Sequence, residues 1–160
     1  HRTEYISMKI FILLFSLFLS GCLKDRITEN QAIELLNNYF YALDIENFSK
    51  NIIDDYITDD YFIYEAEKKM LTEDFKDFIN NAFNSRDLVS TEWKFSDIRV
   101  STDYNSAHIS YINDGSFLSK DGTIIKSKWL ETGYMVKTPN GLKMKFMFSD
   151  NIERKIISPK

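Results

Sequence analysis

The chain has 160 residues and a formal net charge of −4 at pH 7, from 24 acidic and 20 basic side chains. This length suits one domain with its own hydrophobic core. The acidic excess argues against a nucleic-acid partner, because such proteins carry strongly basic surfaces. Cys22 is the only cysteine, so neither an internal disulfide nor a Cys-based metal site is expected.

The first predicted element is a leader segment. Met8 and Lys9 precede an apolar run over residues 10–19, and small residues then lead to Cys22. This pattern is typical of a secretory signal segment. A helix that spans a membrane needs about 20 apolar residues, and this run has about half that number. We therefore expect cleavage between Gly21 and Cys22 rather than a spanning helix.

The sequence Leu19-Ser20-Gly21-Cys22 resembles the lipobox of bacterial lipoproteins. The resemblance implies that Cys22 carries palmitate-type acyl chains and anchors the protein in the cell envelope, outside the cytoplasm. Leu23 is not the aspartate that often retains such proteins at an inner membrane, so the outer membrane is expected if the cell has two. Residues 1–7 are interpreted as an upstream extension, 8–21 as the signal peptide and 22–27 as a tether.

Helices are predicted next along the chain. Thr28 and Gln31 fit a capping box, and apolar residues follow at helical spacing. A second helix is predicted over residues 48–57, a short strand over 61–64, and a third helix that Thr72 caps. The apolar face of the first helix comprises Ala32, Leu35, Leu36, Tyr39, Phe40 and Leu43.

From Thr91 onward the pattern indicates strands. A change of phase near Ser96-Asp97 predicts a bulge, and alternation predicts a strand over residues 107–113. Turns at Asp121-Gly122 and at residues 138–141 predict hairpins around a long strand, 123–137, with a bend near Gly133. The order predicts an α+β domain over residues 28–155.

This order resembles the nuclear-transport-factor-2-like superfamily, also called SnoaL-like, whose fold is cystatin-like. Residues 38–48, 59–62, 129–137 and 142–149 carry the resemblance. It implies N-terminal helices packed in a curved antiparallel sheet, in a cone-like arrangement with a pocket at its open end.

The resemblance to the ketosteroid isomerases of this superfamily implies three catalytic positions. Tyr39 matches their tyrosine donor on the first helix. The position of their general base corresponds to the neighbourhood of Tyr64, with Glu65 one residue beyond. The position of their second hydrogen-bond donor lies near Thr132. Only one of the three positions matches. Tyr39 also lies in the apolar face of its helix, which favours a structural role.

Other chemistry has little support in the sequence. His108 is a weak catalytic candidate on a predicted strand, and no metal or cofactor site is expected. The residues expected to line a pocket are Tyr39, Tyr64, Trp93, Trp129 and Phe146.

The sequence therefore leaves two alternative functions. The first is a lipid-anchored envelope protein, more a binding protein than an enzyme, that holds a small apolar ligand or another envelope protein. The alternative is an isomerase or dehydratase that uses Tyr39 and Glu65, in which case Glu65 should point inward with a raised pKa. A homodimer that pairs through the outer sheet face is a third expectation.

Overall fold

The computed structural model describes residues 25–48 and 51–159. The predictions for residues 1–24, including the signal peptide and Cys22, lie outside this part of the chain. The elements are helices α2 (Glu29–Leu43), α3 (Ile45–Phe48) and α4 (Thr72–Asn84), the 3-10 helix η1 (Ile52–Asp55), and strands β1 (Ile57–Glu65), β2 (Lys68–Leu71), β3 (Leu88–Thr102), β4 (Ser106–Ser119), β5 (Ile124–Thr138) and β6 (Gly141–Ile157).

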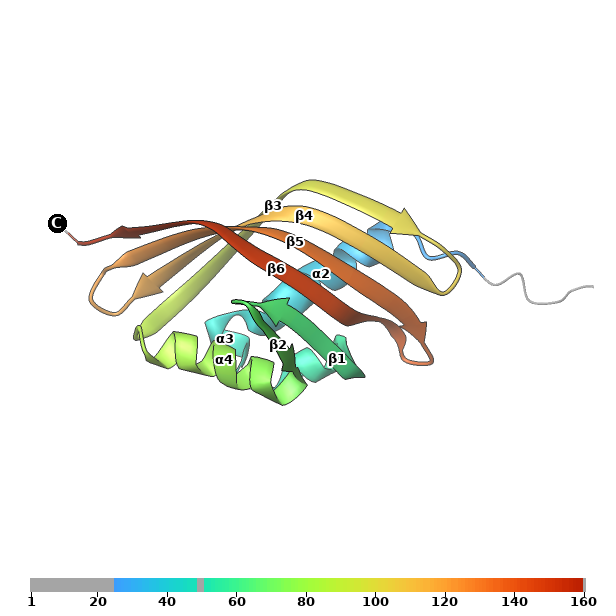
Figure 1. Cartoon of the computed structure of the whole chain (residues 1–160), viewed down its shortest axis with the longest axis horizontal. Helices are drawn as coiled ribbons and strands as arrows, with labels where there is room; N and C mark the ends of the chain where they lie inside the picture. The colour runs from blue at the N-terminus through green and yellow to red at the C-terminus, as the bar shows by residue number, and fades with distance from the viewer. Residues whose placement is uncertain (1–24, 49–50, 160) are drawn as a thin grey trace, which may run out of the picture.

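The six strands form one curved sheet in the order β2-β1-β6-β5-β4-β3. The long strands β3 to β6 bend over α2, while α4 and the β1–β2 hairpin lie below it (Figure 1). The predicted α+β class is confirmed. The sheet is mixed rather than purely antiparallel, because β1 runs parallel to β6.

Helix α2 forms the centre of the core and begins as predicted. Gln31 N–H donates to Thr28 Oγ1 over 3.2 Å, and Thr28 N–H donates to Gln31 Oε1 over 2.9 Å, which completes the capping box. Ala32 and Leu36 are fully buried and Tyr39 is 1% exposed. The apolar stripe therefore packs against the inner face of the sheet.

The predicted second helix over residues 48–57 is wrong. The chain forms the short α3 and η1 instead, and Asn51 between them has φ 54°, a left-handed conformation that interrupts a helix. Strand β1 begins earlier than predicted, at Ile57, and β2 was not predicted. Thr72 is the first residue of α4 rather than its cap: Leu71 N–H donates to Asp74 Oδ2 over 3.3 Å.

Two predicted irregularities shape the sheet. The β3–β4 register shifts between Ser96 and Arg99, and Asp97 has φ 47°, so the bulge is confirmed. On β5, a Cβ atom at Gly133 would lie 2.8 Å from Met144 Sδ, and the register with β6 shifts just beyond it. Because Gly133 has no side chain, the buried residues Met144 and Met147 pack directly against the bent strand.

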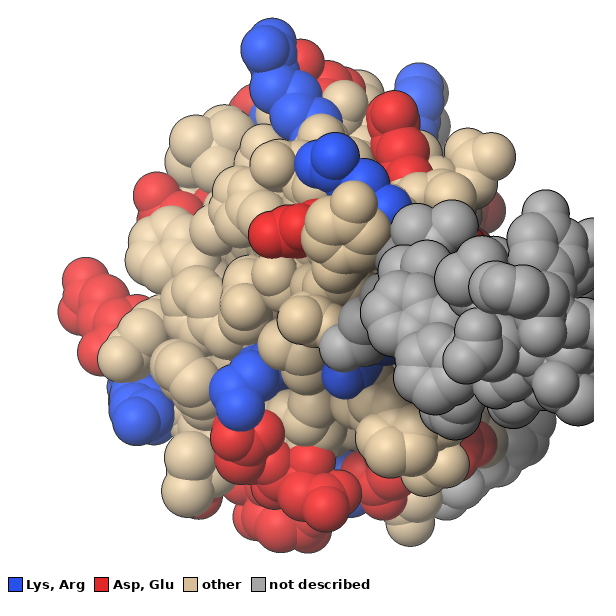
Figure 2. All heavy atoms as spheres, turned by 90° about the vertical axis from the view of Figure 1, so that its right-hand side faces the viewer, with Lys and Arg blue, Asp and Glu red and all other residues tan. Residues whose placement is uncertain are grey.

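The surface is charged with both signs. Acidic and basic side chains lie side by side on the end of the molecule shown in Figure 2. Surface ion pairs include Lys145 with Asp60 at 2.6 Å and Lys76 with Asp54 at 2.8 Å. Within residues 25–48 and 51–159, none of the helices combines the length and the apolar character that a membrane span requires.

Candidate functional site

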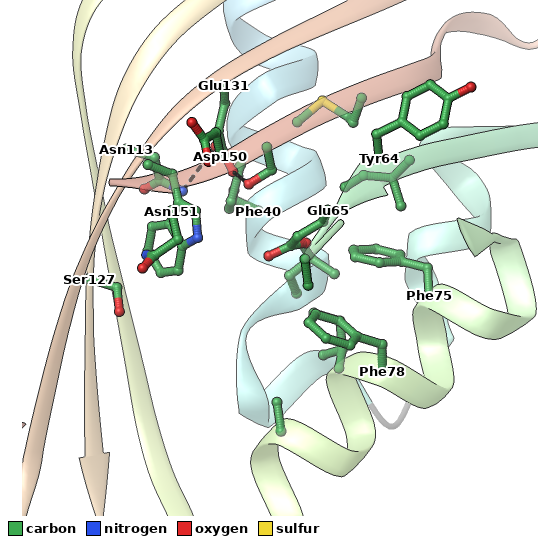
Figure 3. A pocket seen from close by; sticks show the side chains of 18 of the residues that line it. Phe40, Tyr64, Glu65, Phe75, Phe78, Asn113, Ser127, Glu131, Asp150 and Asn151 are labelled. Atoms are coloured by element: carbon green, nitrogen blue, oxygen red, sulfur yellow. Dashed lines mark hydrogen bonds between the residues drawn. The ribbon is translucent and has the colours of Figure 1, made fainter. Parts of the chain in front are cut away.

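A cavity of about 880 Å³ lies between the inner face of the sheet and helices α2 and α4. Its size is within the range of small-molecule sites, and such sites combine an apolar lining with a few polar groups. Aromatic residues from α4, among them Phe75 and Phe78, form part of the lining. Glu65, Asn113 and Glu131 are among the polar residues that line it (Figure 3).

Glu131 on β5 is the buried carboxyl of this cavity. Ser149 Oγ donates to Glu131 Oε1 over 2.8 Å, and Asn113 Nδ2 donates to Oε2 over 3.1 Å. Burial raises the pKa of Glu131 to about 7, although Ser149, Tyr111 and Asn113 act in the opposite direction. Desolvation of the charged form therefore outweighs the donors that stabilise it.

The neighbours of Glu131 leave two buried polar atoms without a hydrogen-bonding partner in the described part of the chain. They are the Tyr111 hydroxyl and Asn113 Oδ1. The hydroxyl lies beside the Glu131 carboxyl, but its geometry does not make a hydrogen bond. Asn113 lines the cavity, so a bound molecule with a donor group could pair with its Oδ1. Buried polar atoms without a partner are rare in proteins.

Glu65 lies at the end of β1 and is half-buried. Its carboxyl points into the cavity, toward the space in front of the helices (Figure 3). Burial, with a smaller contribution from the charge on Glu131, raises the pKa of Glu65 to about 7. The inward orientation and the raised pKa are the two features that the enzymatic alternative required of Glu65.

The two carboxyls titrate as a pair, because the charge on one affects the ionisation of the other. Ionised Glu131 raises the pKa of Glu65, and the donors Ser149 and Asn113 favour the ionised form of Glu131. Near neutral pH one carboxyl of the pair is therefore ionised while the other is protonated. One group can then accept a proton while the other donates one.

Tyr39 lines the cavity but its hydroxyl is already bonded. The hydroxyls of Tyr39 and Tyr61 lie 2.6 Å apart in a buried hydrogen bond between α2 and β1. Burial is the main reason that the pKa of each tyrosine is raised. Tyr39 thus links the helix to the sheet, as the structural interpretation of its sequence position expected.

Trp93 and Trp129 lie in the cavity wall, with ring centroids 6.3 Å apart. Trp93 Nε1 donates to Asp44 Oδ1 over 2.8 Å, which ties β3 to the end of α2. A Cβ atom at Gly115 would lie 2.7 Å from the Trp129 ring. The glycine therefore leaves the space that this ring occupies.

Tyr64 and Phe146, the other two residues expected to line the pocket, do not point into the cavity. Tyr64 borders the cavity, but its side chain is 42% exposed and points away from Glu65 (Figure 3). Phe146 is not part of the lining, which corrects the expectation from the sequence. It packs against Phe62 and Tyr64, with centroids 4.9 and 5.7 Å away, because β6 turns this residue to the outer face.

His108 and Thr132 also face outward, on the side of the sheet away from the carboxyls. His108 is exposed, since the adjacent Ala107 and Ile109 take the inward positions of β4. Its Nε2 lies 2.5 Å from Thr132 Oγ1, and the Thr132 hydroxyl donates its proton to Ile109 O. Neither side chain reaches the buried pair.

Sequence reasoning missed Glu131, which directly precedes the position assigned to the second donor. The alternation of residues along β5 nevertheless indicates that Glu131 is buried. The lysines at 126 and 128 share a phase with Thr132 and mark the outer face, whereas Glu131 shares its phase with Trp129. A carboxylate in an otherwise uncharged inward phase predicts a buried ionisable group.

Across residues 25–48 and 51–159, the structure brings no three His, Cys, Asp or Glu side chains together in a way that could hold a metal ion. The Glu65 and Glu131 carboxyls can accept a proton from a molecule bound in the cavity or donate one to it.

No protein-family model matches the sequence, and no curated protein does either. Solved structures are similar in fold. A proposed aromatic ring hydroxylase from Novosphingobium aromaticivorans has a TM-score of 0.68 and 15% identity, over 79% of this chain and 91% of that one. A proposed scytalone dehydratase from the same organism has a TM-score of 0.63 and 12% identity, over 82% and 88%.

Two further neighbours indicate how widely the fold is used. The association domain of CaMKII from C. elegans has a TM-score of 0.61 and 12% identity, over 76% of this chain and 94% of that one. A nuclear-transport-factor-2-like superfamily protein from Salmonella enterica has a TM-score of 0.59 and 12% identity, over 74% and 86%. At these identities the likeness shows the fold alone, which agrees with the fold that the sequence resemblance implied.

The buried Glu131 carboxyl predicts how stability varies with pH. Its pKa rises from the ordinary 4.5 to about 7 on folding, so its protonated form stabilises the folded protein below pH 4.5. This contribution is lost as pH rises through 7. The free energy of unfolding should fall by up to about 3 kcal/mol from this group. Urea unfolding at pH 5 and pH 8 measures it.

The matched variants for this measurement are Glu131→Gln and Glu34→Gln. Glu131→Gln should remove the share of the loss between pH 5 and pH 8 that Glu131 contributes, and the raised pKa of Glu65 should leave the rest. Glu34→Gln, an exposed position on α2, should keep it. A pH dependence that is the same in all three proteins would contradict the assignment.

Proposed function

We propose that this domain is an acid–base enzyme of the isomerase or dehydratase type, acting on a small apolar molecule in the cavity. The observation that carries the proposal is the pair of inward carboxyls, Glu65 and Glu131, each with a pKa raised to about 7. A general acid or base works best when its pKa lies near the working pH. The pair favours this alternative over non-catalytic binding.

In the proposed reaction, ionised Glu131 removes a proton from a carbon next to a carbonyl group. Protonated Glu65 donates a hydrogen bond or its proton to the oxygen on which negative charge develops. An isomerase returns the proton to a different carbon. A dehydratase instead gives the Glu65 proton to a leaving hydroxyl, so that water departs as the carbon–carbon double bond forms.

Two hydrogen-bond donors of the fold position Glu131, the proposed base. Asn113 and Ser149 each bond one oxygen of Glu131, and each oxygen keeps a second lone pair free to accept a proton. Glu131 is buried, which strengthens electrostatic effects at its carboxyl. The fold shared with a proposed scytalone dehydratase is compatible with this chemistry.

Solvent exchange tests proton abstraction without requiring the natural substrate. We expect the protein to speed the exchange of deuterium from D₂O into the carbon next to the carbonyl of 1-tetralone, an apolar bicyclic ketone, as followed by NMR. Glu131→Gln should slow the catalysed rate by about 100-fold or more. The rate should peak near pH 7, where one carboxyl of the pair is ionised and the other protonated.

Glu65→Gln should also slow exchange, whereas the matched change Glu34→Gln on the exposed face of α2 should leave the rate within about twofold. No acceleration above the background rate, or equal rates in all four proteins, would contradict the enzymatic proposal. Non-catalytic ligand binding would then be the better account of the cavity.

We also propose that lipid on Cys22 holds the domain at the cell envelope. Support comes from the lipobox-like residues 19–22 and the short tether before Thr28. One acyl chain anchors a protein only marginally, whereas two or three anchor it stably. The cavity would then lie close to a membrane surface.

Metabolic labelling with an alkyne fatty acid tests the anchor in bacteria that express the full chain. The label should attach to the protein and follow it into the membrane fraction. Cys22→Ser should abolish the label, and no other cysteine is present to give a background. An intact mass that retains the leader, or a free thiol at Cys22, would overturn the assignment.

A second copy of the chain is the partner that we propose for the outer sheet face. The outer aromatic patch consists of Phe62, Tyr64, Tyr134, Phe146 and Phe148. Cross-strand pairing makes it continuous, since Tyr64 pairs with Phe148 and Tyr134 with Phe146. Tyr64, Tyr134 and Phe148 are each at least 40% exposed, and exposed apolar patches commonly mark interfaces. The CaMKII neighbour is itself an association domain.

Sedimentation equilibrium should therefore detect a dimer. Phe148→Lys should shift it to monomer, because a charge in the centre of an apolar interface is costly. Tyr104→Lys, at a 53% exposed aromatic outside the patch, should leave the dimer intact. A wild-type monomer at all concentrations tested would refute the pairing.

A further inference from the structure

Two arginines line the same cavity as the two carboxyls. Arg86 follows the end of α4, and Arg154 lies near the end of β6. Arg154 pairs in register with Ser127, whose buried side chain also lines the cavity. Residues that pair across neighbouring strands lie on the same face of the sheet, so this register places Arg154 on the inner face.

The two guanidinium groups interact unfavourably. Burial, with an added contribution from the charge on Arg154, lowers the pKa of Arg86. Arg86 Nη1 donates to Ala82 O over 3.2 Å, which fixes the guanidinium at the end of α4. Arg86 is half-buried and Arg154 is exposed. Two positive charges near each other repel, and an anion between them relieves the repulsion.

No carboxylate of the described residues neutralises this pair. The ion pairs found in residues 25–48 and 51–159 involve neither Arg86 nor Arg154. Glu153, the acidic neighbour of Arg154 in the sequence, pairs with Lys155. Asp150, which also borders the cavity, forms no ion pair with either arginine.

The arginines and Glu131 lie at different depths of the cavity. Ser149 pairs with Glu131, and Arg154 pairs with Ser127, so four residues of β5 separate the two positions. That separation corresponds to about 13 Å along the strand. Trp129 lies between them on the inward face of β5, with Trp93 and Phe117 packed against its ring. The space between the charged groups is therefore walled by aromatic rings.

We propose that Arg86 and Arg154 form an anion subsite, and that the cavity takes a small molecule with an aromatic or alicyclic body and one carboxylate. The planar guanidinium matches a carboxylate with two parallel hydrogen bonds. The aromatic wall accommodates the ring system, and the opposite end of the molecule reaches Glu131 and Glu65. A singly charged group suits the site better than a doubly charged phosphate, because the buried carboxyl pair repels negative charge.

This inference rests on the proposed function, since it names the class of substrate for that same site. It also assigns a role to side chains that proton transfer does not require. The arginines would orient the molecule so that its uncharged end faces the acid–base pair.

Two isosteric probes test the subsite: naphthalene-2-carboxylate and its neutral analogue naphthalene-2-carboxamide. Isothermal titration calorimetry should show that the carboxylate binds about tenfold more tightly or better, as expected for a charge-assisted pair. Both tryptophans of the chain, Trp93 and Trp129, line the cavity, so intrinsic fluorescence gives an independent reading of occupancy at that site.

Arg154→Gln should reduce carboxylate affinity about tenfold and leave the affinity for the carboxamide unchanged. The double change at Arg86 and Arg154 to Gln should abolish the preference for the carboxylate. Arg99→Gln, which alters an exposed arginine paired with Asp97 on β3, should keep it. Equal affinity of the wild type for both probes, no binding of either, or an unaffected preference in Arg154→Gln would overturn the inference.

The two proposals can fail separately. Deuterium exchange into 1-tetralone without a carboxylate preference would overturn the anion subsite and leave the enzymatic proposal in place. A carboxylate preference without any catalysed exchange would refute proton abstraction but retain the subsite as a binding site.

Discussion

Desolvation of the Glu131 carboxyl is the constraint on which the site depends. The sheet carries this side chain into the interior, where its charged form loses hydration that the hydrogen bonds from Ser149 and Asn113 only partly replace. The result is a pKa near neutrality and a charge that acts on Glu65 at the other side of the cavity. Without this burial Glu131 would be ionised at pH 7 and could not hold a proton there, whereas Glu65 would keep the part of its raised pKa that its own burial causes.

The fold supplies that burial through features that are far apart in the sequence. Strand β5 alternates its side chains so that Glu131 shares the inner face with Trp129, and the inner face is covered by α2 and α4 (Figure 1). The Tyr39–Tyr61 bond joins α2 to β1, and Asp44 joins the end of α2 to Trp93 on β3. These links hold α2 against the inner face of the sheet.

Local signals allowed much of the fold to be predicted, and non-local pairing limited the rest. The capping box and apolar stripe of α2 are complete within one segment, so its start and buried face followed from the sequence. Residues 48–57 carry a similar stripe, but Asn51 is left-handed and the helix does not form. The parallel pairing of β1 with β6 joins segments more than 80 residues apart, which no local pattern reveals. The inward orientation of Glu65 was expected if this residue took part in catalysis. Glu131 was recognised as its partner only from the structure, which shows which residues of β5 face inward.

Direct titration of the glutamate carboxyls by ¹³C NMR is the measurement closest to the central claim. In the wild type, two carboxyl resonances should titrate near pH 7, and Glu131→Gln and Glu65→Gln should each remove one of them. In Glu131→Gln the pKa of Glu65 should also fall, because the charge that helps to raise it is gone, yet stay above 4.5 because its burial persists. Titration of every glutamate near pH 4.5 would contradict the account.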